Sequence, residues 1–209
     1  MKKLMLPIIF CLMTVVVQAQ TEHLKFMGIP LDGKINDFQS QLLKKGCTLD
    51  ELFMKYGKSK GNRVYEGSFA GNNARIVVFF NEKTKKVYRA KAIISAYSDE
   101  QVKQKYFEMK SMLMDKYDVQ YRLRQKYGES LGDSLTGNFR WYFEDTEDKY
   151  ESTSFMVIDV EHFERIGEID LFVRERELSI SYRTEYNLHV DYIDRENNIA
   201  DQDDRMDDL

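Results

Sequence analysis

The stretch that decides the fold is VYEGSFAGNNARIVVFFNEKTKKVYRAKAIIS, residues 64–95. It contains three runs typical of β-strands, at 64–69, 74–80 and 87–95, in which apolar residues alternate with polar ones or follow one another. The two connections are short and rich in Gly, Asn and Lys, as hairpin turns are. We therefore expect an antiparallel meander whose middle strand, apolar on both faces, is the most buried.

An apolar stripe at helical spacing precedes this meander and a second one follows it. The first covers residues 34–46 and ends at Gly46, a residue suited to the position after a helix. The second covers residues 99–117 and begins with a capping box formed by Ser98 and Gln101. Runs of strands after each helix favour antiparallel sheets with the helices on one face.

A second group of strands is predicted after the second helix. Its runs lie at 138–144, 153–160, 168–173 and 178–183. The sequence therefore predicts an α+β fold of antiparallel β-meanders with helices packed on one face. Because a helix precedes strands twice, the domain of residues 20–195 could be two helix-plus-meander units, 20–97 and 98–195, or one continuous sheet.

The N-terminus has the pattern of a signal peptide. Lys2 and Lys3 are followed by an apolar run, and Val17-Gln18-Ala19 resembles a cleavage site. We expect residues 1–19 to be removed on export, which makes the protein periplasmic or secreted. No later apolar run is long enough for a transmembrane segment.

Charge argues against one class of partner. The chain has 31 basic and 35 acidic side chains, and loss of the two leader lysines leaves 29 against 35, a net charge of −6. This balance argues against binding to nucleic acid. Eight of the acids and two of the bases lie between Asp191 and Leu209, where large apolar residues are few. We expect residues 196–209 to form an acidic, disordered tail.

Motifs for metal, cofactor or nucleophilic chemistry are not found in the sequence. The three histidines, His23, His162 and His189, lack metal-ligand spacing, and the mature chain keeps a single cysteine, Cys47. We interpret Cys47 as a small buried apolar residue rather than a reactive or dimer-linking thiol. No cofactor and no metal site are predicted.

One basic and aromatic cluster is a candidate binding surface. Its residues and a tryptophan further along are Tyr117, Tyr121, Arg122, Arg124, Lys126, Tyr127 and Trp141. Such interleaving can stack sugars or bases and suits recognition surfaces. The alternative is a helix end whose tyrosines pack on the sheet, with the tryptophan in the core.

A further pattern carries a resemblance. FMGIPLDG at 26–33 is followed by Phe38, Leu42 and Lys45-Gly46, and then by GSFAG at 67–71. In residues 26–46 and 67–71 the chain resembles small exported α+β proteins of Bacteroidetes that are uncharacterised in activity. The resemblance implies a periplasmic or secreted α+β protein and no particular activity.

These observations leave two classes of function. The first is an exported, non-catalytic binding or interaction module of the bacterial envelope, with an envelope protein or a glycan as its partner. The second is a glycan-directed hydrolase that uses dispersed carboxylates, because such an enzyme needs only two acids at the right distance. A pocket with two close acids would favour the hydrolase.

Cleavage after Ala19 would leave a chain that begins at Gln20. We expect the intact mass of protein isolated from the exporting cells to correspond to residues 20–209, with or without cyclisation of the terminal glutamine. Mass spectrometry that finds Met1 on this material would contradict processing.

Overall fold

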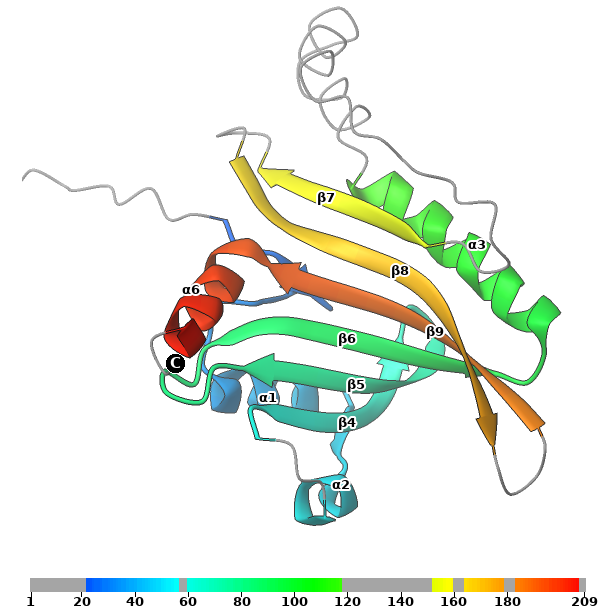
Figure 1. The fold of residues 1–209 in the computed structure, drawn as a ribbon, viewed down its shortest axis with the longest axis horizontal. Coiled ribbons are helices and arrows are strands. Elements are labelled where there is room, and N and C mark those ends of the chain that lie inside the picture. Colours follow the sequence, from blue (N-terminus) through cyan, green and yellow to red (C-terminus); the bar gives the residue numbers. More distant parts are fainter. Residues whose placement is uncertain (1–21, 57–59, 118–151, 160–163, 179–182, 207–209) are drawn as a thin grey trace, which may run out of the picture.

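The computed structural model describes residues 22–56, 60–117, 152–159, 164–178 and 183–206. The predicted signal peptide, 1–19, and the predicted strand at 138–144 lie outside these residues. The fold is α+β with antiparallel sheets, as the sequence predicts (Figure 1). Among the described residues, no helix is both long and apolar enough to cross a membrane.

The elements follow one another in two groups. The first is β1 (Lys25–Phe26), β2 (Ile29–Pro30), α1 (Ile35–Lys44), β3 (Thr48–Leu49), α2 (Glu51–Tyr56), β4 (Asn62–Phe69), β5 (Asn72–Phe80) and β6 (Val87–Ala96). The second is α3 (Asp99–Tyr117), β7 (Thr153–Asp159), β8 (Glu164–Leu178), β9 (Arg183–Asp194) and α6 (Arg195–Met206). Both predicted helices are therefore present.

The two meanders form one sheet rather than two. Its seven strands have the order β3-β4-β5-β6-β9-β8-β7, and all of its pairs are antiparallel. The last strands of the two meanders, β6 and β9, join at the centre, in register from Arg89 opposite Ile193 to Ala96 opposite Tyr186. Of the two arrangements left open by the sequence, the continuous sheet is the one observed.

The ends of both helices follow from local sequence. Gly46 takes a φ of 84° just after α1, a backbone conformation that costs glycine little. At the start of α3, Ser98 Oγ accepts a hydrogen bond of 3.3 Å from the backbone N–H of Gln101. The Gln101 side chain in turn accepts one of 3.1 Å from the N–H of Tyr97. The predicted capping residues therefore do act at this helix end.

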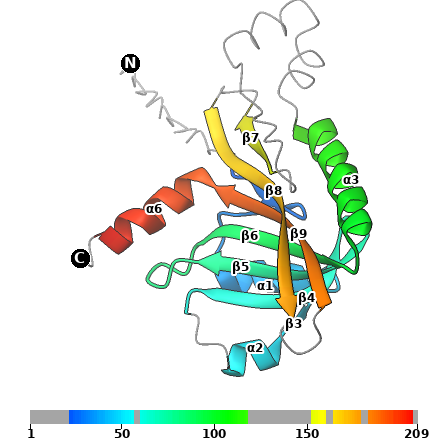
Figure 2. The same cartoon turned by 45° about the vertical axis from the view of Figure 1, so that its right-hand side comes forward.

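The core lies between one face of the sheet and helices α1 and α3. Figure 2 shows α1 behind strands β4 and β5. An aromatic cluster ties three parts of the chain together here. The ring of Phe26, in β1, stacks on Phe69, in β4, at 5.3 Å and meets Tyr192, in β9, edge-on at 5.3 Å. These buried rings link the N-terminal hairpin to both meanders.

The expectation that β5 is the most buried strand is wrong. Val77, Phe79 and Phe80 of β5 are only half-buried. Three of the nine residues of β5 are buried, against six of the ten in β6. The reason is that β5 is central in a three-stranded meander, whereas β6 is central in the seven-stranded sheet that the two meanders build.

The prediction of one strand at 178–183 is also wrong. Leu178 ends β8 and Arg183 begins β9, and the two residues are antiparallel register partners. The two ends of the predicted run thus belong to two different long strands, whose pairing extends to Gly167 opposite Asp194. Long-range pairing over twelve residues of β9 thus overrides the local pattern.

Residues 196–206 of the predicted disordered tail instead belong to helix α6, which lies against the sheet (Figure 1), and residues 207–209 lie outside the described residues. Asp194, fully buried, caps this helix by accepting a hydrogen bond of 3.0 Å from the N–H of Asn197. Asn81, in the β5–β6 connection, donates to Asp201 at 3.1 Å and to Asp204 at 2.8 Å. Polar contacts, which composition alone does not reveal, offset the ordering entropy of this acidic segment.

Asp194 also holds the N-terminal hairpin. Its carboxylate accepts hydrogen bonds from the N–H of Leu24 at 3.1 Å and from Nδ1 of His23 at 3.0 Å. The hydrogen bond to Asp194 raises the pKa of His23 above its ordinary 6.5. This pair therefore stabilises the fold fully below pH 6.5, and its contribution is lost as pH rises through the raised pKa.

Two neighbouring asparagines of α6 test whether the helix is docked. Asn197 is 5% exposed and donates from Nδ2 to the carbonyl of Leu31 at 2.6 Å, whereas Asn198 is partly exposed. We expect Asn197→Ala to lower the free energy of unfolding by about 1–3 kcal/mol, because it leaves a buried carbonyl without its partner. Asn198→Ala, the matched control, should change it by less than about 0.5 kcal/mol. Equal effects of the two variants in urea melts would contradict docking of α6.

Candidate functional site

The sheet face opposite α1 and α3, here called the open face, carries mostly polar and charged side chains. Strand alternation and register place on it residues of β5, β6, β8 and β9 that include Arg75, Arg89, Lys91, Ile93, Ser95, Asp170, Phe172, Arg174, Glu185, Asn187, His189 and Asp191. Their counterparts on the other face, such as Ala92 and Val190, lie in the core. Strand alternation thus places apolar side chains on the core face and most of the charged and polar side chains on the open face.

Asp191 is the most buried charged group of the open face, with a side chain only 1% exposed. The Arg89 guanidinium donates to both of its oxygens, at 2.8 Å from Nε, and Lys91 Nζ lies 2.7 Å from Oδ2. The carboxylate raises the pKa of Arg89 through this hydrogen bond. Because the three groups come from β6 and β9, this cluster reinforces the central strand pair.

Next to this cluster two rings stack across β8 and β9. Phe172 and His189 are register partners whose rings lie 4.8 Å apart at an interplanar angle of 8°. Lys91 Nζ lies 5.4 Å, and the Arg174 guanidinium 5.2 Å, from the centroid of the Phe172 ring. Stacking between the two rings and cation–π contacts with Lys91 and Arg174 stabilise the position of the Phe172 and His189 side chains.

The same surroundings keep the His189 ring neutral. Burial lowers the pKa of His189 to about 4, and the charges of Lys91 and Arg174 act in the same direction. Its Nδ1 atom is buried and has no hydrogen-bond partner among the described residues. A neutral imidazole can both donate and accept a hydrogen bond, which suits recognition of a polar ligand.

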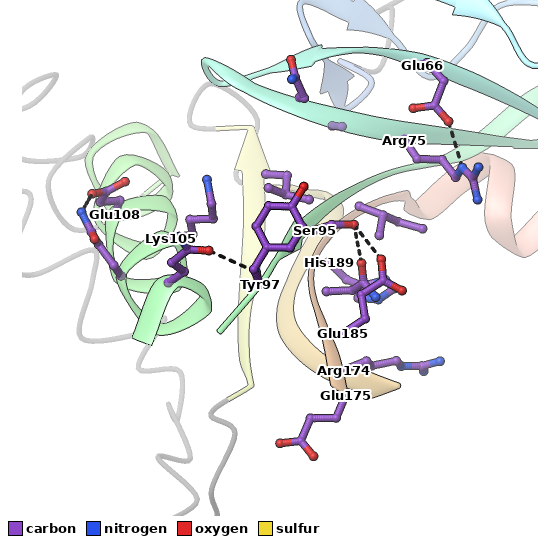
Figure 3. Close-up of a pocket in the computed structure, with 17 residues that line it drawn as sticks. Glu66, Arg75, Ser95, Tyr97, Lys105, Glu108, Arg174, Glu175, Glu185 and His189 are labelled. Atoms are coloured by element: carbon purple, nitrogen blue, oxygen red, sulfur yellow. Dashed lines mark hydrogen bonds and ion pairs between the residues drawn. The ribbon is translucent and has the colours of Figure 1, made fainter. Parts of the chain in front are cut away.

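At one end of the open face lies a groove of about 1010 Å³. Its walls are the first turns of α3 and the adjoining parts of β4, β5, β6, β8 and β9. Figure 3 shows Tyr97 in the middle, with Lys105 and Glu108 of α3 on one side and Glu185 and His189 on the other. The groove is the described feature most suited to holding a ligand.

Charged groups of both signs line this groove in near balance. The carboxylates are Glu66, Glu108, Glu175 and Glu185, and the cations are Arg75, Lys105 and Arg174. Arg75 pairs with Glu66 at 3.0 Å, and Lys105 donates to Asn72. Neutral polar groups come from Asn73, Ser95, Gln101, Gln104, Asn187 and His189. The lining therefore offers hydrogen-bond donors and acceptors over its whole length.

Tyr97 is the aromatic residue of the groove, and 94% of it is exposed. It occupies the junction between β6 and α3, where the hydrogen bond from its N–H to Gln101 fixes its backbone. Burial of an aromatic ring is strongly favourable, so a ring this exposed gains most from a ligand that covers it.

The described residues offer no group of three or more His, Cys, Asp or Glu side chains that could hold a metal ion. Cys47 is 2% exposed and belongs to the core cluster, in agreement with its interpretation as a buried apolar residue. Burial raises the pKa of its thiol, which disfavours the reactive thiolate.

The candidate surface predicted from sequence is not brought together here. Tyr117 is 7% exposed, lies in the core and meets Tyr192 edge-on at 6.4 Å, which leaves little of it available for binding. It packs on the sheet, as the alternative interpretation held. The other predicted residues, Tyr121, Arg122, Arg124, Lys126, Tyr127 and Trp141, lie outside the described residues.

The groove residues were missed because β9 was not predicted. Its sequence does hold the signal: Tyr186, Leu188 and Val190 alternate with Glu185, Asn187 and His189, the pattern of a half-buried strand. The last predicted strand ends at residue 183 and the predicted acidic tail begins at residue 196, so no element is predicted for the residues between them. Tyr97 carried no local signal, because a single exposed ring gives no pattern.

The neutral state of His189 can be measured directly. We expect its imidazole carbon signals in NMR spectra to show no titration between pH 8 and about pH 5, since its pKa is about 4. Lys91→Met should move the titration to higher pH by removing a nearby positive charge, whereas Lys103→Met, an exposed lysine of α3, should not.

The lowered pKa also predicts how stability responds to acid. The contribution of a neutral His189 is fully present above pH 6.5 and is lost as pH falls from 6.5 towards 4, because the unfolded chain binds the proton first. In the NMR titration of the wild-type protein, a midpoint for His189 between pH 6 and 7 would contradict a buried, neutral imidazole ring.

Comparison of the chain with known protein families, with curated proteins and with solved structures finds no match. The groove and its residues are therefore the basis on which function is proposed.

Proposed function

We propose that this chain is an exported, non-catalytic binding module of the bacterial envelope, and that the groove beside Tyr97 is its binding site. The observation that carries the proposal is the groove itself, about 1010 Å³ in volume, where the ends of the strands meet the first turns of α3. Its side chains come from five strands and one helix, so a rigid scaffold positions them.

Export is the second part of the proposal. It is supported by the pattern of residues 1–19, with two lysines, an apolar run and Val17-Gln18-Ala19. The resemblance of residues 26–46 and 67–71 to small exported proteins of Bacteroidetes agrees with this location. An envelope protein or a glycan of the cell surface is then the partner that the module meets.

The charges of the groove support a binding role that does not involve nucleic acid. With four carboxylates against three cations, the groove does not present the basic stripe that phosphate backbones need. In the main ion cluster of the open face, Arg89 and Lys91 share the carboxylate of Asp191, so both cations already have a partner within the protein.

The alternative, a glycan-directed hydrolase, is favoured by one observation. Four carboxylates line the groove, those of Glu66, Glu108, Glu175 and Glu185, so several acids lie within one site. Glu185, however, lies 3.3 Å from Ser95 Oγ, so its carboxylate already has a polar neighbour within the protein. The binding module therefore remains the better supported function, and the hydrolase is tested beside it.

A substitution that fills the groove tests the site. Ser95 is exposed, points from β6 into the groove and donates to Asn187 at 2.8 Å. Ser154 is an exposed serine on β7, at the far edge of the same sheet, and donates to Asp170 at 2.6 Å. Ser95→Tyr therefore occupies the groove, and Ser154→Tyr is its matched control.

The measurement is capture from periplasmic extract and culture medium of the producing bacterium. Eluted material is quantified by peptide mass spectrometry and by monosaccharide analysis after acid hydrolysis. We expect wild type and Ser154→Tyr to retain the same component, and Ser95→Tyr to retain at least about tenfold less of it. Equal retention by all three proteins would contradict the groove as the site. New reducing ends released during incubation would contradict a non-catalytic role and favour the hydrolase.

A further inference from the structure

We infer that the ligand of the groove is a neutral oligosaccharide, with one sugar ring stacked on Tyr97. This inference rests on the proposed binding function and adds the chemical class of the ligand. It is carried by the exposure of the Tyr97 ring, the polar groups around it, the near balance of charge and the size of the groove.

The first argument is the presentation of the aromatic ring. Tyr97 is 94% exposed and lines the groove at the junction between α3 and the strands, so its ring is free to meet a ligand there (Figure 3). The hydrogen bond from its N–H to Gln101 ties its backbone to the first turn of a capped helix. A sugar ring has an apolar face of C–H groups that can cover such a ring, while its hydroxyls point sideways.

The second argument is the set of polar side chains that line the groove beside the Tyr97 ring. Ser95 Oγ contacts Glu185 at 3.3 Å and Asn187 at 2.8 Å, which holds a carboxylate and an amide next to one another. On the helix side, Gln104 donates to Glu108 at 2.8 Å and forms a second pair of amide and carboxylate. Such pairs present donors and acceptors together, and a hydroxyl group needs both.

The third argument is charge. The lining carries four carboxylates and three cations, a formal balance of −1, and Arg75 is already paired with Glu66. A polyanionic ligand would be repelled by the four carboxylates, and a polycationic ligand by Arg174 and Lys105. A neutral ligand rich in hydroxyl groups avoids both conflicts and can use every one of these groups.

The fourth argument is size and apolar content. A volume of about 1010 Å³ lies at the upper end of the roughly 300–1,000 Å³ typical of ligand pockets, so there is room for several sugar rings. Apart from Tyr97, the apolar residues of the lining are Ala74, Ile93 and Ile94, of which two are buried. The lining thus lacks the apolar pockets in which peptide side chains anchor, which favours a sugar chain over a peptide.

The test is isothermal titration of the exported protein with a panel of neutral hexasaccharides, made of glucose, mannose, xylose or N-acetylglucosamine units. Hexagalacturonate serves as an anionic comparison and a hexapeptide of alanine and serine as a peptide comparison. The variants are Tyr97→Ala, Tyr97→Phe, which keeps the ring, and Tyr56→Ala, which removes a tyrosine 70% exposed on α2.

We expect at least one neutral hexasaccharide to bind wild type more tightly than its disaccharide does. Tyr97→Ala should weaken this binding at least about tenfold, while Tyr97→Phe and Tyr56→Ala stay within about threefold of wild type. Retained binding in Tyr97→Ala would overturn the stacking role, and tighter binding of hexagalacturonate or of the peptide would overturn the ligand class.

Failure of this inference can be told apart from failure of the proposed function. If no neutral hexasaccharide binds while Ser95→Tyr still abolishes capture from the extract, the module stands and the carbohydrate inference is wrong. If the hexasaccharides do not bind and capture does not depend on Ser95, both are wrong.

Discussion

The structure depends on the antiparallel pairing of β6 with β9. This strand pair, here called the seam, joins two meanders that are far apart in the sequence. Different interactions stabilise the pair on the two faces of the sheet. On the core side, Ala92 lies opposite Val190, and both are fully buried. On the open side, Arg89 and Lys91 enclose the carboxylate of Asp191. Removing that carboxylate would leave two cations without their partner at the middle of the sheet, which is costly in a buried setting.

The seam also creates the candidate site. Because the two meanders meet at their last strands, the end of β6 comes to lie beside the start of β9, and Ser95 reaches Glu185 and Asn187. The chain then turns into α3 at Tyr97, so the helix rises beside the same strand ends and completes the groove (Figure 3). Neither meander alone has these walls. A binding function at this place therefore follows from one sheet, and would not be available to two separate units.

Much of the fold could be predicted from the sequence, because the signals were local. The strands at 64–95 and the caps of the two helices are decided by alternation, turns and side-chain hydrogen bonds close in sequence. The errors arose where long-range contacts decide. Composition marked the C-terminal segment as disordered, but the hydrogen bonds of Asp194 and Asn81 order it into α6. The groove could not be predicted, since its residues converge only through the register of β9 with β6 and β8.

Native-state hydrogen exchange tests the central claim, that one cooperative sheet is built on the seam between β6 and β9. The account predicts that amides in the middle of β6 and β9, such as those of Ala92 and Val190, exchange only through global unfolding and share one free energy of opening. Exchange of the β7–β9 amides at a lower free energy than those of β4–β6, with the seam opening first as denaturant is added, would contradict it. Such a result would mean that the two meanders are separate units that merely touch.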